Sequence, residues 1–91
     1  MNIYILNVLN KDNLTQEQLK DNTAAARVAY TTHVADARAY AAFLATYTAA
    51  TAAYVDTDTA YWLDEYFKLT GETRSDYEAE LQRDNSFREV S

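Results

Sequence analysis

Residues 39–62 read AYAAFLATYTAATAAYVDTDTAYW, and this stretch decides the fold class. It repeats a tyrosine every seven residues, and no charged residue stands between Ala39 and Val55. Seven residues are nearly two helical turns, so the repeat predicts rings along one face of one helix. The tyrosines of the repeat are Tyr40, Tyr47, Tyr54 and Tyr61. The chain is therefore predicted to be mainly all-α.

Clear start and stop signals place the main helical region at about residues 15–70. Thr15 followed by Gln18 forms a capping-box sequence, which favours a helix start. Gly71 is the only glycine of the chain and suits the left-handed residue after a helix end. Cap-type and β-branched residues at 30–33 and 55–59 could break this region. Two alternatives follow: one long helix rich in alanine and tyrosine, or a helical hairpin or three-helix arrangement.

The two ends of the chain differ from the middle. Residues 2–9 are rich in β-favouring residues, which predicts a short strand or an extended arm within residues 1–13, with the first turns of a helix as the other alternative. Ser75 and Glu78 form a second capping-box sequence, which predicts a short acidic helix and tail over residues 75–91. Residues 1–91 are expected to form a single small helical domain.

The tyrosine repeat also predicts a surface for self-association. Large rings beside alanine suit close helix packing, and a strict seven-residue repeat favours left-handed supercoiling. The partner positions of such a coil turn polar at Asp36, Thr57 and Asp64, so packing in a bundle fits better than a long zipper. The predicted self-association face consists of Tyr40, Phe43, Leu44, Tyr47, Tyr54 and Tyr61.

Composition and charge narrow the class of partner. The chain has 91 residues, 16 of them alanine, so its core is small and association with a copy or another protein would help it. The net charge is −6, and all of it falls in residues 56–91, which argues against direct binding to nucleic acid. Membrane insertion of residues 39–55 is an unfavoured interpretation, because the segment is mostly alanine and threonine and its flanks, Arg38 and Asp56, make no pair of basic anchors. A second candidate partner face combines acids with aromatic rings: Asp56, Asp58, Trp62, Asp64, Glu65 and Tyr66.

No catalytic, cofactor or metal motif is apparent. His33 and Asp36 stand three residues apart, which would place them on one helix face, but two ligands do not make a metal site. Phosphate-loop, zinc-site and catalytic-triad sequences are absent. We therefore expect a protein that is not an enzyme and needs no cofactor. The first residues lack a basic segment, which predicts no secretory signal and a cytoplasmic or virion-associated location.

Two functional hypotheses follow from these observations. The first is a helical structural or interaction protein that self-associates as a component of a larger assembly. The second is a small acidic inhibitor, or nucleic-acid mimic, that binds a basic site on a host protein. The short, acidic, cysteine-free chain is similar in style to many small bacteriophage proteins, a likeness that carries no functional residue with it.

Overall fold

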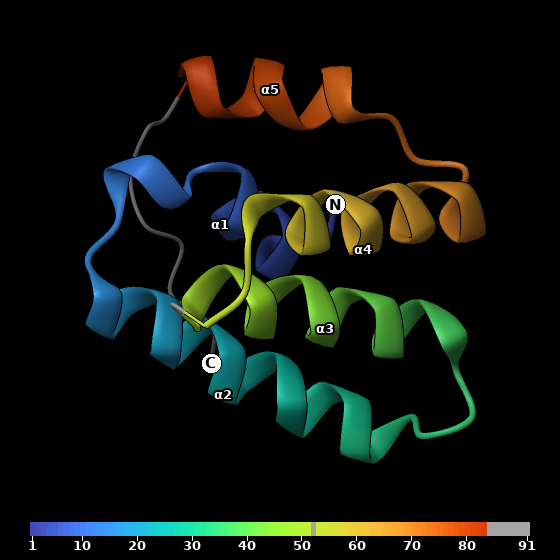
Figure 1. The fold of residues 1–91 in the computed structure, drawn as a ribbon. Helices are drawn as coiled ribbons and strands as arrows, with labels where there is room; N and C mark the ends of the chain where they lie inside the picture. The colour runs from blue at the N-terminus through green and yellow to red at the C-terminus, as the bar shows by residue number, and fades with distance from the viewer. Residues whose placement is uncertain (52, 84–91) are drawn as a thin grey trace.

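The computed structural model describes residues 1–51 and 53–83, and all regular structure in this part of the chain is helical (Figure 1). The predicted all-α class is therefore confirmed. The predicted tail beyond Arg83 lies outside the described residues, as does Ala52. The elements are α1 (Ile3–Leu9), the short 3-10 helix η1 (Lys11–Asn13), α2 (Gln16–Thr32), α3 (Ala37–Ala50), α4 (Asp56–Thr70) and α5 (Arg74–Arg83).

The region predicted as one long helix, or as a helical hairpin or three-helix arrangement, is divided into three helices, as the last of these alternatives has it. Figure 1 shows α2 and α3 running antiparallel, and α4 antiparallel to α3 on its other side. The radius of gyration is 11.9 Å, close to the value of about 12 Å expected for a compact domain of this length. The alternative of one continuous helix is therefore wrong. The breaks fall near residues 33 and 55, where cap-type and β-branched residues favour a change of backbone direction.

Local signals in the sequence explain two of the helix ends. The Thr15 hydroxyl accepts from the Gln18 amide at 3.1 Å, and the Gln18 side chain accepts from the Thr15 amide at 2.9 Å. This is the predicted capping box. Gly71 ends α4 with φ of +76°, as predicted, and its N–H donates to the Phe67 carbonyl. The second capping box is misplaced by two residues, because a cap at Ser75 predicts a helix that begins at Asp76, whereas α5 begins at Arg74 and includes Ser75.

The N-terminal segment forms a helix instead of the predicted strand or extended arm. The Asn2 side chain caps α1 by accepting from the amides of Tyr4 and Ile5 at 2.9 and 3.2 Å. Four consecutive residues, from Ile5 to Val8, are buried, with exposures between 0 and 2%. A helix that is buried on every side has no polar face, so its sequence lacks the helical period. Tertiary burial has overridden the β propensity of this segment.

The core forms where α1 packs across the layer of α2, α3 and α4. Ile5, Leu6 and Val8 of α1 contact small residues of α3, which allow the two helices to approach closely. Buried amides join α1 to α2 by a hydrogen bond of 2.9 Å from Asn7 Nδ2 to Asn22 Oδ1. The remaining core residues are Ala41, Ala42, Ala45, Leu63, Tyr66 and Tyr77.

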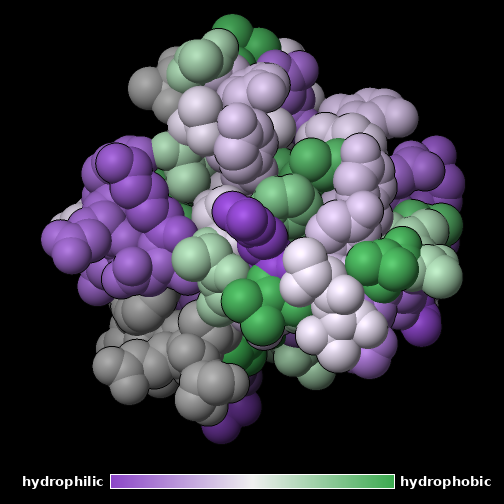
Figure 2. Space-filling view, turned by 90° about the horizontal axis from the view of Figure 1, so that it is seen from below, coloured by the Kyte–Doolittle hydropathy of each residue, from purple (hydrophilic) through white to green (hydrophobic). Residues whose placement is uncertain are grey.

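The surface seen from the side of α2 is mixed in character. Figure 2 shows strongly hydrophilic residues gathered at the end of the molecule where α2 begins, with hydrophobic and near-neutral residues toward the middle. Among residues 1–51 and 53–83, the structure has no helix with both the length and the apolar character needed to cross a membrane.

Candidate functional site

A chain of aromatic rings crosses the surface of α2, α3 and α4, and we call it the aromatic belt. Adjacent rings have centroids between 4.9 and 6.1 Å apart, within the range of favourable aromatic contacts. The order of contact along the belt is Tyr61, Trp62, Tyr40, Tyr30, Phe43, Tyr47 and Tyr54.

The four repeat tyrosines do not lie on one helix, as the seven-residue spacing had predicted. Tyr40 and Tyr47 are on α3, Tyr54 is in the connection after it, and Tyr61 is on α4. The chain reverses direction between the second and fourth of these tyrosines. They are nevertheless joined through side chains outside the repeat, since Trp62 lies between Tyr40 and Tyr61.

The belt is packed at its base and exposed at its outer edge. The four repeat tyrosines have exposures of 43, 39, 43 and 58% in chain order. Three further rings, Tyr30, Phe43 and Trp62, are half-buried between the helices, and so is Leu44, one helical turn after Tyr40. Each exposed tyrosine is thus supported by a neighbour while keeping contact area available to a partner.

Within the belt, the pKa of the Tyr54 phenol is raised above its ordinary value. Tyr47 is the main cause of a raised pKa at Tyr54, and Asp58 acts in the same direction from the first turn of α4. A nearby negative charge disfavours a second one, so the Tyr54 phenol ionises only at a higher pH than an ordinary tyrosine.

The predicted acidic partner face is divided between surface and core. Tyr66 is only 3% exposed and belongs to the core, because its side of α4 faces α1 and α5. Asp56 is exposed, and its Oδ1 lies 3.0 Å from Lys11 Nζ. Glu65 Oε2 lies 3.9 Å from Lys68 Nζ. Asp58 is partly exposed and Asp64 is exposed, while Trp62 belongs to the aromatic belt.

A second group of tyrosines is buried where the N-terminus meets α4 and α5. The hydroxyls of Tyr66 and Tyr77 both donate to Glu72 Oε1, the first at 3.0 Å. The Tyr77 oxygen also accepts from the Asn2 amide at 2.9 Å. We call these four residues the tyrosine–glutamate network. It connects the start of α1 to the turn after α4 and to α5.

Burial is the main cause of the raised pKa values of Tyr66 and Tyr77. An ionised phenol would be poorly solvated there, and it would also lie beside the carboxylate of Glu72. Both phenols are therefore held in the neutral form, in which each can donate its proton to the carboxylate.

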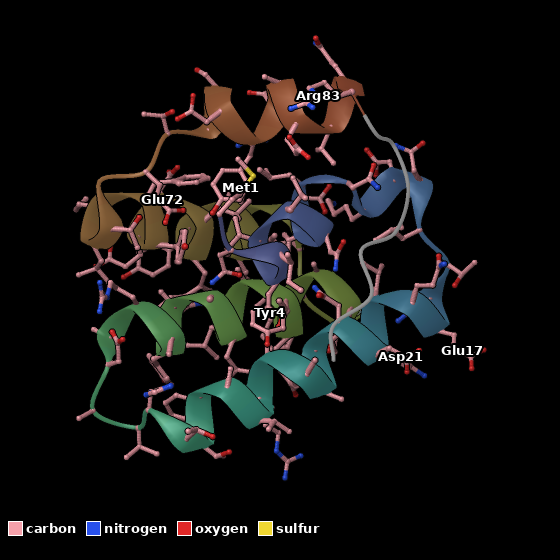
Figure 3. All side chains as sticks on the ribbon, turned by 180° about the vertical axis from the view of Figure 1, so that it is seen from behind. Met1, Tyr4, Glu17, Asp21, Glu72 and Arg83 are labelled. Atoms are coloured by element: carbon pink, nitrogen blue, oxygen red, sulfur yellow. The ribbon has the colours of Figure 1, made fainter. Side chains whose placement is uncertain are left out.

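A cleft of about 280 Å³ opens beside this network. Its apolar wall consists of alanines, including Ala29 of α2 and Ala42 of α3. Tyr4, Tyr66 and Glu72 also line the cleft. Figure 3 shows Tyr4 extending from α1 toward α2 and α3, and Glu72 in the turn after α4. Four helices and a turn thus converge on one concave site.

Three polar residues complete the cleft: His33 and Asp36 from the α2–α3 connection, and Arg38 from the first turn of α3. His33 follows the end of α2 and Asp36 caps α3, so the prediction that they share one helix face is wrong. Asp36 is paired with Arg38, whose Nε and Nη2 donate to its two carboxylate oxygens at 3.1 and 3.2 Å. This ion pair lowers the pKa of Asp36, chiefly through the side-chain hydrogen bond. Among the described residues, no group of three or more histidine or acidic side chains is placed to hold a metal ion.

Sequence reasoning missed the cleft and the tyrosine–glutamate network. Both depend on residues that are far apart in the chain, such as Asn2 and Tyr77, whose hydrogen bond spans 75 positions. The only local signal was the left-handed Gly71, which turns the chain at Glu72. Comparison with protein-family models, with curated proteins and with solved structures found no match in any of the three.

Proposed function

We propose that this protein is a non-enzymatic helical interaction protein that self-associates through the aromatic belt as a component of a larger assembly. The observation that carries the proposal is the continuity of the belt, in which partly exposed rings from three helices contact one another. Connected exposed aromatic rings are typical of protein interfaces, where they supply much of the binding energy.

A second copy of the chain is the occupant that the charge distribution favours. Two molecules with a net charge of −6 repel each other over most of their surfaces. No charged residue stands between Arg38 and Asp56, a segment that supplies four of the seven belt rings. Two copies can therefore approach at this face with little repulsion. A two-fold arrangement would place the same rings on both sides of the interface.

Sedimentation velocity over a concentration series tests this proposal. We expect the wild-type protein to form a dimer or a larger oligomer at micromolar concentration. Tyr47→Ala should raise the dissociation constant at least tenfold, because it removes an exposed ring that joins Phe43 to Tyr54. Tyr47→Phe retains the ring and should associate much more like the wild type.

The matched surface control is Val28→Ala. Val28 is 65% exposed on α2 and takes no part in the ring contacts of the belt. It should leave the association unchanged. A wild-type protein that stays monomeric at about 100 µM, or a Tyr47→Ala variant that associates as tightly as the wild type, would contradict self-association through the belt.

A further inference from the structure

The cleft beside the tyrosine–glutamate network has an unbalanced charge. Asp36 and Arg38 neutralise each other through their paired hydrogen bonds. Glu72 has no ion-pair partner among residues 1–51 and 53–83, and its carboxylate accepts from phenols alone. The charge left for a ligand to meet is therefore negative.

The remaining walls suit a short apolar group that carries a positive charge. Tyr4 and Tyr66 supply aromatic rings, whose faces attract cations. The alanines of α2 and α3 that line the cleft can contact a hydrocarbon chain without offering it a polar group. The volume of about 280 Å³ lies near the lower end of the range for small-molecule sites.

We propose that this cleft binds an alkylammonium group, with Glu72 as its counter-ion and Tyr4 and Tyr66 as its aromatic walls. The group is either a free small amine or the side chain of a lysine in a peptide. The two phenols hold the carboxylate in place by donating to one of its oxygens, Oε1. The proposal is independent of self-association, because no residue of the aromatic belt lines the cleft.

The test is titration of the full chain with n-butylammonium, followed by calorimetry and by amide chemical shifts in NMR. We expect saturable binding, with the largest shifts at residues around the cleft. Equimolar n-butanol and butyrate match the length of the chain but are neutral or negative, and they should not saturate the site. Equal binding of either of these compounds, or no saturable binding of the amine, would overturn the proposal.

Paired variants locate the site. Glu72→Gln should weaken the binding of n-butylammonium at least tenfold, whereas Glu78→Gln makes the same change of charge on the exposed surface of α5 and should bind as the wild type does. Ala29→Leu fills the cleft without altering Glu72, so it gives an independent result if Glu72→Gln folds poorly. Wild-type affinity in the folded Ala29→Leu variant would overturn the assignment.

A further titration, with a blocked lysine, distinguishes the two sources of the ammonium group. Acetyl-lysine amide, blocked at its backbone ends and free at its side chain, should saturate the site if the cleft admits a lysine of a partner. Saturation by n-butylammonium alone would assign the site to a free amine. Either pattern supports an ammonium site, and failure of n-butylammonium to saturate the cleft contradicts it.

Discussion

The aromatic belt and the tyrosine–glutamate network use the same residue type in opposite ways. The repeat tyrosines of the belt are 39–58% exposed, and they contact other rings. Tyr66 and Tyr77 are 3 and 1% exposed, and their hydroxyls donate to Glu72. In the belt the tyrosines interact through their rings, whereas in the network they interact through their hydroxyls, which donate to Glu72.

The difference follows from what surrounds each ring. A buried phenol must replace its hydrogen bonds to water, so Tyr66 and Tyr77 require Glu72 as an acceptor. An exposed phenol keeps its water, and the edge of its ring can meet a partner. We therefore expect stability to depend on the network and association to depend on the belt.

The largest expected effect on stability comes from truncating a tyrosine of the network, and truncating a tyrosine of the belt is the comparison. Tyr77→Ala should lower the free energy of unfolding by about 3–5 kcal/mol, because it leaves a cavity among α1, α4 and α5 and removes a phenol from Glu72. Tyr61→Ala, in the belt, should cost less than about 1 kcal/mol. Urea unfolding monitored by circular dichroism measures both. Equal losses in the two variants would break the contrast between network and belt.

A smaller effect on the free energy of unfolding is expected when the pH is raised. Tyr66 and Tyr77 have raised pKa values in the folded protein, so the fold favours their neutral forms. Their contribution to stability is complete below the ordinary tyrosine pKa of about 10 and is lost as the pH rises above it. Each such group lowers the free energy of unfolding by about 1.4 kcal/mol per pH unit until its folded pKa is reached.

Tyr77→Phe isolates one of these two groups. Its free energy of unfolding should decline less steeply between pH 10 and pH 11 than that of the wild type, because one of the two linked ionisations is absent. Chemical unfolding at a series of pH values measures the two slopes. Equal slopes in the wild type and the variant would show that Tyr77 ionises as readily in the folded chain as in the unfolded chain.

The smallest effect concerns the turn that brings Glu72 to the network. Gly71 has φ of +76°, and a Cβ added there would meet no atom within 4 Å. Gly71→Ala should therefore cost only the backbone term, about 1 kcal/mol. Thermal unfolding measures this cost, and the belt should still support association in the variant. A loss of unfolding free energy above about 3 kcal/mol would show that Gly71→Ala costs more than the backbone term.

The sequence predicted those features whose physical cause is local. The capping box at Thr15 was correct because the side chains of Thr15 and Gln18 complete their hydrogen bonds within one turn. The stop at Gly71 was correct because glycine adopts positive φ without strain. The breaks near residues 33 and 55 were indicated, although the sequence left open whether the chain would continue through them as one helix.

The N-terminal segment shows why other features could not be predicted. Ile5, Leu6 and Val8 have the composition of a strand, and only burial against α3 makes a helix their stable form. The seven-residue tyrosine repeat predicts one helix, but the reversal of the chain after α3 distributes the repeat over two helices and a connection. The members of the self-association face stay a prediction that the sedimentation experiment addresses.

The sequence by itself determined the helical class, two of the helix boundaries and the uneven charge, because each arises from neighbouring residues or from composition. Only the tertiary structure decided which tyrosines are buried and which form the belt. It also placed Glu72 between Tyr66 and Tyr77 and opened the cleft beside them. These features depend on contacts between distant segments, and such contacts form only when the helices bury their apolar faces together.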